Sequence, residues 1–336
     1  MKIAIAGGSG SVGRVLDRAL RAHGHEIVVL GRHVYPTDGA HFVKWDGRTV
    51  GPWAEEIDGA DVVINLAGRS VNCRYTAKNL TQMLASRVDS TRAVGLAIER
   101  AVRPPRVWLQ MSTATIYAHS FDAPNDEATG RIGGEEPDAP GYWRFSIEIA
   151  KAWEGEQQDA NTPRTRRVAL RTAMVMSPDR GGVFDSLFRM TRLGLGGAIG
   201  GGAQYVSWIH ERDFVRAVEF LLEHEDLQGP VNLASPNPLP QREFMAVLRR
   251  ATGRRACLPA TAWMAEVGAF FLRTDTELLL KSRRVVPGRL LSSGFAFEFP
   301  EWSGAAEDLV ARRDSSLGGP GFRGIGTRSS SSAASS

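Results

Sequence analysis

The chain has 336 residues, of which 43% are hydrophobic and 23% are charged, and its formal net charge is +4. A chain of this length can bury a full core in one large domain or two smaller ones, and its composition is ordinary for a soluble globular protein. Because Lys and Arg are scattered among Asp and Glu, the sequence excludes an extended basic surface, and we expect no nucleic-acid partner.

The first elements of the chain form a strand, a glycine-rich loop and a helix. The residues Lys2–Ala6 are an apolar run of strand length, and Val12–His23 follows helical spacing. Between them, Gly7 would allow a tight turn, Gly10 would let a phosphate approach the backbone, and Gly13 would let the helix pack against the strand. The free N–H groups and the dipole of that helix favour an anion over the loop.

This context favours a dinucleotide site over a plain structural turn. We assign the site to Gly7, Ser9, Gly10, Ser11, Val12 and Gly13.

Strands and helices alternate through the first 175 residues. Strands are predicted at Lys2–Ala6, Glu26–Leu30, His41–Trp45, Asp61–Leu66, Arg106–Met111 and Arg167–Met174, and helices at Val12–His23, Ala77–Val102 and Trp143–Gln158. Such alternation predicts an α/β fold of Rossmann type, a doubly wound parallel sheet covered by helices on both faces. We expect residues 1–175 to form the dinucleotide-binding domain, with residues 205–235 contributing to it.

The pattern changes after this point. Glycine-rich loops occur at residues 181–182 and 194–202, the second being either a flap over a substrate or a plain connector. Further helices are predicted at Arg212–Glu225, Gln241–Thr252 and Ala260–Leu272, and a short strand at Val231–Ala234. We expect residues 176–313 mostly to form a smaller, mixed C-terminal subdomain on the substrate side. Residues 314–336 have little apolar surface and are predicted to be a disordered tail.

Arg32 follows the second predicted strand, where NAD-binding folds carry an acidic residue. A planar guanidinium suits a 2′-phosphate, so we expect NADP rather than NAD; the alternative is a solvated arginine. The predicted cofactor site is completed by Asp46, Leu66, Ala67 and Gly68.

Hydroxyl groups gather where the fifth predicted strand ends. Ser112, Thr113 and Tyr117 lie in or just after it, at the sheet edge where a substrate carbonyl could accept a hydrogen bond. An ordinary polar strand end is an equal alternative on spacing alone.

Together these segments resemble the extended short-chain dehydrogenase/reductase superfamily. The residues that carry this resemblance are Gly7-x-x-Gly10-x-x-Gly13, Asn65-Leu-Ala-Gly and Ser112-Thr-Ala-Thr-Ile-Tyr117. More narrowly, the chain is similar to the atypical, NAD(P)-dependent epimerase-like branch, through Ser86-Arg-Val-x-Ser-Thr91, Trp153-Glu154, Leu170-Arg-Thr and Ser207-Trp-Ile-His-x-x-Asp213. The resemblance covers roughly residues 1–313.

In that superfamily a Tyr-x-x-x-Lys pair transfers a proton while hydride moves to or from the nicotinamide. Counting back from Trp153 places these two positions at Phe145 and Ile149, neither of which can titrate. The resemblance therefore implies that the usual pair is absent here.

The resemblance matches Thr113 to the catalytic hydroxyl, with Ser112 and Tyr117 completing the predicted catalytic set. Two histidines are alternative proton donors. We expect His210 to cap a helix instead, and His119 to be solvated.

These features support an NADP-dependent oxidoreductase or epimerase-like protein that acts on a small carbonyl or sugar-like molecule. The alternative is a non-catalytic NADP(H)-binding sensor or scaffold. We expect no metal site. The sequence is compatible with either a monomer or a homodimer.

The expected compartment is the cytoplasm. The two cysteines, Cys73 and Cys257, lack redox or metal spacing, which suits a reducing environment. Only four apolar residues separate Lys2 from the first glycine, so we expect no signal peptide. The most apolar stretch, residues 263–272, is too short to span a bilayer, and we expect no membrane partner.

Overall fold

The computed structural model describes residues 1–32, 41–71, 73–136, 143–254, 257–258 and 280–317. Its centre is a seven-stranded sheet in the order β10-β6-β5-β4-β1-β2-β3, with every neighbouring pair parallel. The strands are β1 (Lys2–Ala6), β2 (Glu26–Gly31), β3 (His41–Lys44), β4 (Val62–Asn65), β5 (Val107–Thr113), β6 (Arg166–Thr172) and β10 (Gly229–Leu233). This order confirms the predicted doubly wound Rossmann-type fold.

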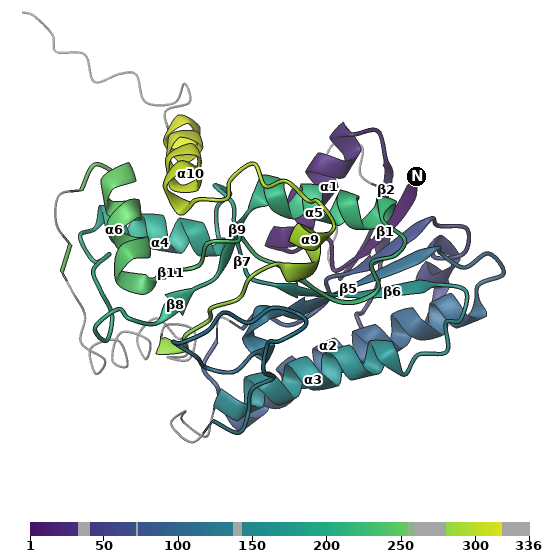
Figure 1. The fold of residues 1–336 in the computed structure, drawn as a ribbon. Coiled ribbons are helices and arrows are strands. Elements are labelled where there is room, and N and C mark those ends of the chain that lie inside the picture. The colour runs from purple at the N-terminus through teal and green to yellow at the C-terminus, as the bar shows by residue number, and fades with distance from the viewer. Residues whose placement is uncertain (33–40, 72, 137–142, 255–256, 259–279, 318–336) are drawn as a thin grey trace, which may run out of the picture.

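Helices cover both faces of this sheet (Figure 1). On one face, α1 (Ser11–Ala22) and α5 (Glu211–Glu223) pack their apolar sides against the central strands. On the other face lie α2 (Ala77–Arg100) and α3 (Arg144–Gln158), which pack along each other. Strands buried on both faces need apolar residues throughout, as in Ile3 to Ala6, which are fully buried.

The strand predicted as Arg167–Met174 divides into two in the structure. β6 ends at Thr172, and β7 (Met174–Met176) leaves the sheet to pair with β9 (Trp208–His210). The break lies at Ala173, whose N–H donates to the carbonyl of Leu233 at 3.0 Å. The division depends on strand β9, far along the chain, so local apolarity could not predict it.

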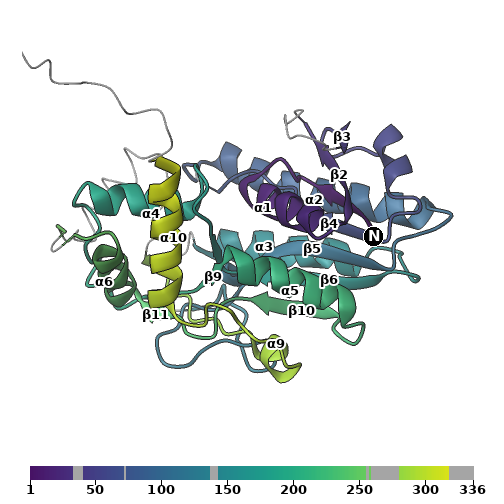
Figure 2. The same ribbon diagram turned by 90° about the horizontal axis from the view of Figure 1, so that it is seen from above.

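A second core lies beside the carboxyl end of the sheet. Helices α4 (Val183–Arg192), α6 (Gln241–Ala251) and α10 (Trp302–Leu317) gather there, as Figures 1 and 2 show. Fully buried Trp302 stacks on Phe244 with ring centroids 4.1 Å apart, and its indole N–H donates to the Phe244 carbonyl at 2.9 Å. The remaining short elements are η1 (Pro52–Glu56), η2 (Ala114–Ile116), β8 (Tyr205–Val206), β11 (Leu239–Pro240) and α9 (Gly288–Ser292).

The C-terminal helix corrects the predicted start of the tail. Helix α10 continues to Leu317, and the Asp314 carboxylate lies 3.8 Å from the Arg192 guanidinium of α4. The prediction of disorder from residue 314 is therefore wrong for residues 314–317, because they continue a helix whose earlier turns are anchored in a packed core. The predicted helix at 260–272 and residues 318–336 lie outside the described residues.

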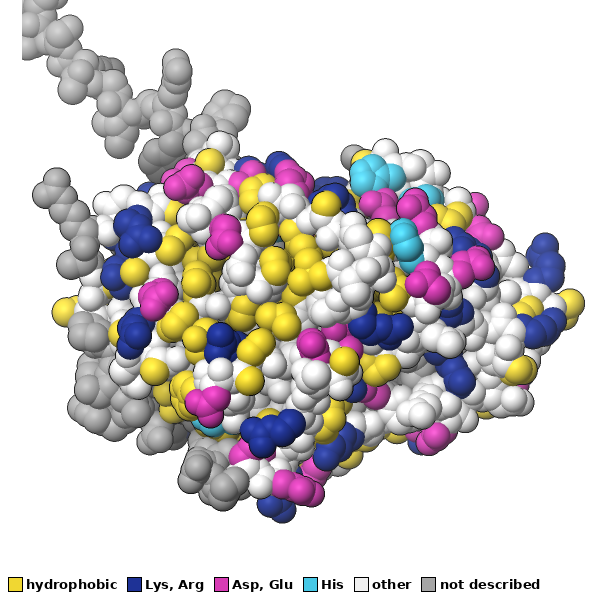
Figure 3. Space-filling view, viewed as in Figure 1, with side chains coloured by type: hydrophobic (Ala, Val, Ile, Leu, Met, Phe, Trp, Pro, Cys, Tyr) yellow, Lys and Arg dark blue, Asp and Glu magenta, His cyan; other side chains and the backbone are white. Residues whose placement is uncertain are grey.

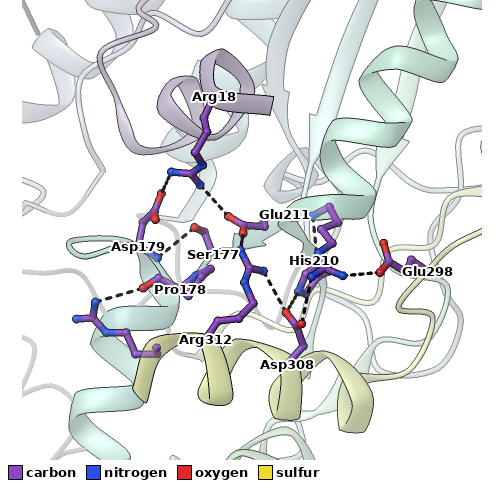
Figure 4. A network of polar contacts seen from close by, with 11 residues as sticks. Arg18, Ser177, Pro178, Asp179, His210, Glu211, Glu298, Asp308 and Arg312 are labelled. Carbon is purple, nitrogen blue, oxygen red and sulfur yellow. Dashed lines mark hydrogen bonds and ion pairs between the residues drawn. The ribbon is translucent and has the colours of Figure 1, made fainter. Parts of the chain in front are cut away.

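A network of ion pairs connects α10 with α1 and with the start of α5, which cover one face of the sheet (Figure 4). From α1, Arg18 contacts Asp179 at 3.1 Å and Glu211 at 3.6 Å. Glu211 also pairs with Arg312 of α10, whose other amino group lies 3.1 Å from Asp308. These contacts fix the C-terminal helix against both α1 and the start of α5.

His210 caps α5 as predicted, since its Nδ1 accepts from the Arg212 N–H at 3.1 Å. The other ring nitrogen then donates to Asp308, 3.1 Å away. Asp213, in the first turn of the same helix, accepts from the N–H groups of Glu298 and Phe299, at 2.7 and 2.8 Å.

Lys and Arg side chains are interspersed with Asp and Glu on the face drawn in Figure 3. Among the residues described, no helix has the length and apolarity needed to cross a membrane.

Candidate functional site

The glycine loop packs directly against the end of β4. Gly7 has φ +75°, and a Cβ there would lie 2.7 Å from the backbone of Ala67, a distance that no side chain tolerates. A Cβ at Gly13 would lie 2.4 Å from the Gly8 carbonyl oxygen, so at this position α1 packs on the backbone of the loop. Both glycines are required by backbone contact within the protein.

Gly10 differs from these two. It is exposed, and among the residues that the structure describes a Cβ there would meet one atom beyond its chain neighbours within 4 Å, the Gly7 carbonyl oxygen at 3.5 Å. Gly10 is also the N-cap of α1, where no side chain supplies a capping hydrogen bond. The amides of the first turn, at Ser11, Val12 and Gly13, can therefore donate to an anion lying over Gly10.

Two further residues, at the end of β2, lie beside the glycine loop. A Cβ on Gly31 would lie 3.2 Å from the Ser9 hydroxyl oxygen, so the loop crosses the strand end closely. Arg32 follows immediately and is exposed. Gly31 was not among the predicted site residues, although a glycine ending a buried strand beside the motif is a signal for such a crossing.

Asp46 builds its own turn. One carboxylate oxygen accepts from the N–H groups of Arg48 and Thr49, both at 2.9 Å, and the other accepts from the Thr49 hydroxyl at 2.6 Å. Although burial opposes it, these bonds hold the pKa of Asp46 below its ordinary value. Asp46 thereby fixes the chain after β3; its contact with a cofactor stays a prediction.

Asn65 organises the third part of the edge. Its amide donates to Gln110 at 3.0 Å, and its side-chain oxygen accepts from the Ala67 N–H at 3.0 Å. The turn through Leu66, Ala67 and Gly68 is thereby held against Gly7, and Gly68 is exposed. The sequence prediction included these three residues but not the asparagine that shapes them.

The hydroxyl group of Ser112 belongs to a buried network. It donates to Glu154 at 2.5 Å, and Arg171 binds the same carboxylate through two nitrogens at 2.9 and 2.8 Å. The remaining Arg171 nitrogen donates to the Tyr117 hydroxyl at 3.0 Å, which in turn donates to Asn232 at 2.9 Å. The network joins β5, α3, β6 and β10 behind the strand ends.

Tyr117 is only 2% exposed, and burial raises the pKa of its hydroxyl. With its proton directed at Asn232, this hydroxyl is committed to the interior. Thr113 is different, because it is partly exposed and its Oγ1 accepts from the Thr115 N–H at 3.1 Å, which leaves its own proton available to another acceptor. The structure therefore separates Thr113 from the two other hydroxyls that the sequence grouped with it.

A basic cluster that the sequence interpretation missed adjoins η2. Lys281, 2% exposed, donates to the Thr115 carbonyl at 2.9 Å, and Arg283 donates to the Thr115 hydroxyl at 3.1 Å. His119, expected to be solvated, is half-buried, and its Nδ1 accepts from the Ser282 N–H at 2.8 Å. Burial, and then the charge of Lys281, lowers the pKa of His119. The sequence around Thr115 and His119 could not indicate this burial, because the contacting residues, Lys281 to Arg283, are far away along the chain.

The two positions matched to the tyrosine and lysine both lie on α3. Phe145 is half-buried and Ile149 is 6% exposed. Neither side chain can exchange a proton with a ligand.

Comparisons with known proteins identify the family of the chain. A model of the NAD-dependent epimerase/dehydratase family matches residues 3–234, and a domain of unknown function matches residues 260–309. The human epimerase family protein SDR39U1 is 31% identical over 317 residues, covering 93% of this chain and all of the relative. The epimerase family protein YfhF of Bacillus subtilis is 30% identical, covering 93% of this chain and 99% of its own length.

Solved structures show the same relationship. The crystal structure of human SDR39U1 with NADPH superposes with a TM-score of 0.80 at 28% identity, covering 93% of this chain and 99% of that one. A nucleoside-diphosphate sugar epimerase from Corynebacterium glutamicum gives a TM-score of 0.70 at 25% identity, covering 94% of this chain and 61% of that protein.

Proposed function

Because the chain belongs to the NAD-dependent epimerase/dehydratase family, we propose that it is an NADP-dependent oxidoreductase or epimerase-like enzyme acting on a small carbonyl or sugar-like substrate. The observation that carries the proposal is the N-terminus of α1 at Gly10. No side chain of the N-cap bonds to the amides of its first turn, and an added Cβ at Gly10 has room, whereas the neighbouring Gly7 packs tightly on Ala67. These are the features that accept a pyrophosphate. Bound NADP would accept or supply a hydride.

The preference for NADP rests on Arg32. Arg32 is exposed and directly follows Gly31, whose added Cβ would lie 3.2 Å from the Ser9 hydroxyl oxygen. In this fold the adenosine ribose of a dinucleotide is bound at that strand end. A guanidinium can hold two phosphate oxygens at once. The NADPH in the crystal structure of the human relative supports the same choice.

Thr113 is the group we propose to contact the substrate. Its hydroxyl accepts from a backbone N–H and keeps its own proton available, and a carbonyl oxygen beside the nicotinamide would accept that proton in a hydrogen bond. Ser112 and Tyr117 are positioning residues, since their hydroxyls hold the Glu154–Arg171 pair behind Thr113. Because Tyr117 then donates no proton to the substrate, water or a hydroxyl group of the substrate would supply it.

A non-catalytic NADP(H) sensor is the second candidate, and Phe145 and Ile149 favour it. Positioned acid–base groups typically contribute about 10² to 10⁴ in rate, and an enzyme without a titrating pair at these positions would be slow. The two candidates share the cofactor site and differ in turnover.

The first test measures cofactor affinity by fluorescence titration. We expect NADPH to bind at least about tenfold more tightly than NADH, a difference of roughly 1.4 kcal/mol. Arg32→Ala should remove most of this preference, whereas Arg100→Ala, which deletes an exposed charge at the far end of α2, should preserve it. Equal affinities in the unaltered protein would refute the NADP assignment.

The second test separates enzyme from sensor. The NADPH-loaded protein is mixed with quinones, aldehydes and keto-sugars, and absorbance of the reduced nicotinamide is followed. Oxidation above the protein-free rate supports the enzyme, and tight binding with no turnover across the panel supports the sensor.

A further inference from the structure

Three arginines of the described residues are almost fully buried, and one of them differs from the others. Arg171 is 8% exposed and pairs with Glu154, and Arg313 is 6% exposed and pairs with Asp185. Arg87 is 9% exposed and has no carboxylate partner in the part of the chain that the structure describes. A buried charge without a counter-ion is costly and is seldom kept for stability alone.

The guanidinium of Arg87 is held in one orientation. It lies over the ring of Trp153 from α3, 4.8 Å from the centroid, and Nη1 donates to the carbonyls of Met83 and Arg69 at 3.0 and 3.1 Å. Burial lowers the pKa of Arg87 to about 10, so the side chain still carries its charge at neutral pH. Nε and Nη2 donate to no residue that the structure describes.

The same side chain borders the proposed cofactor site. A Cβ on Gly68 would lie 3.3 Å from both Cγ and Cζ of Arg87, so the guanidinium lies alongside the turn that follows β4. That turn packs on Gly7 through Ala67, and Gly68 itself is exposed. The unpaired charge is therefore at the carboxyl edge of the sheet, where ligands of this fold bind.

We propose that Arg87 binds an anionic group of the substrate, a carboxylate or a phosphate, through its Nε and Nη2 edge. Two parallel N–H donors match two oxygens of either group, and a buried position strengthens the contact. The bound anion would supply the counter-charge that Glu154 and Asp185 supply to the other two buried arginines. This inference rests on the proposed function, and it narrows the substrate to an anionic carbonyl or sugar-like compound.

The test titrates the full-length, NADPH-saturated protein with inorganic phosphate and, separately, with malonate, by calorimetry. We expect at least one anion to bind, and the stronger of the two identifies the group. Arg87→Met should weaken that binding by about tenfold or more, and Arg87→Lys, which keeps the charge but loses the planar fork, by a smaller factor. The control is Arg92→Met on the same helix, an exposed residue paired with Glu156, which should bind as the unaltered protein does.

In the titrations, the proposal is overturned if neither anion binds, if Arg87→Met binds normally, or if Arg92→Met loses as much binding as Arg87→Met. Melting temperature gives an independent readout. Removal of an uncompensated buried charge should leave the melting temperature unchanged or raised, and phosphate or malonate should raise it only in proteins that keep Arg87. A fall of several degrees in Arg87→Met would assign the arginine a structural role instead. If Arg87→Met does not fold, Arg87→Lys decides the question.

NADPH affinity distinguishes this failure from failure of the proposed function. Arg87→Met should bind NADPH within about twofold of the unaltered protein. A tenfold loss would place Arg87 on the cofactor and overturn the substrate assignment, with the cofactor site intact. If the unaltered chain bound no NADPH, the proposed function would fall, and the anion titration of the cofactor-free chain would still test Arg87.

Discussion

Gly10 and Gly13 lie three residues apart, yet a side chain would meet different surroundings at each. At Gly13 an added Cβ collides with the Gly8 backbone, whereas at Gly10 it meets a single carbonyl oxygen at an ordinary contact distance. The sequence motif already predicts packing at Gly13 and phosphate approach at Gly10, and the structure adds that the backbone of Gly8 is what Gly13 packs against.

Substitution at the two glycines should therefore have opposite consequences. Gly10→Val should fold with a nearly unchanged melting temperature and lose NADPH binding, because its branched side chain fills the phosphate path. Gly13→Ala should lower the melting temperature by several degrees, because the Gly8 backbone has to shift. Thermal denaturation and NADPH titration of both variants check this. Normal NADPH binding by a folded Gly10→Val protein would show that the glycine loop is only a structural turn and does not bind the cofactor.

Thr113 permits a test of chemistry that spares the cofactor. Thr113→Val keeps the shape of the side chain and removes the hydroxyl, so turnover of a substrate should fall by roughly 10² while NADPH affinity stays the same. The matched control is Thr172→Val on β6, the register partner of Thr113, whose hydroxyl bonds to the Leu170 carbonyl. Unchanged kcat in Thr113→Val would remove this hydroxyl from the mechanism.

At the scale of elements, the sequence predicts what depends on local periodicity. The strands, the helices on both faces of the sheet and the Gly7 turn follow from apolar spacing and from glycine chemistry. Contacts that join distant segments do not, as the division between β6 and β7 and the burial of Tyr117 illustrate. The network from Ser112 through Arg171 to Asn232 joins four elements, and each residue alone resembles an ordinary polar position.

The joint between α5 and α10 should make stability depend on pH. Burial lowers the pKa of His210 to about 4, against the opposing effect of Asp308, so the folded protein holds the ring neutral while the unfolded chain protonates near pH 6.5. The unfolded state then binds the additional proton, and stability is lost as pH falls from about 6.5 to 4, by at most about 3 kcal/mol.

Denaturant unfolding from pH 7.5 to 4 measures that loss. His210→Asn should be less stable at pH 7.5 and should show a shallower decline toward low pH. Substitution of the exposed His41 with Asn should preserve the full decline. Parallel pH curves for His210→Asn and the unaltered protein would exclude His210 as the cause.

At the scale of the whole molecule, a group of ion pairs connects the core of the sheet with the core around α10. The sheet and its helices form the first core, and α4, α6 and α10 form the second around Trp208, Phe244 and Trp302. Arg18, Glu211 and Arg312 connect them, so the C-terminal helix is part of the structure that supports the glycine loop helix. The stretch that follows Leu317 has a different composition, rich in serine and glycine and with few apolar residues.

Two truncations distinguish these parts of the C-terminus. Removal of residues 318–336 should leave the melting temperature and NADPH affinity unchanged, because the segment offers little apolar surface to a core. Removal of residues 302–336 also deletes α10, which exposes Phe244 and Trp208 and leaves Glu211 without Arg312. Loss of a buried tryptophan alone typically costs about 3 to 5 kcal/mol, so this shorter chain should unfold at much lower denaturant or fail to fold. A melting temperature several degrees lower in the first truncation would mean that Phe322 or Ile325 contributes to a core, and an unaffected second truncation would show that α10 contributes nothing to stability.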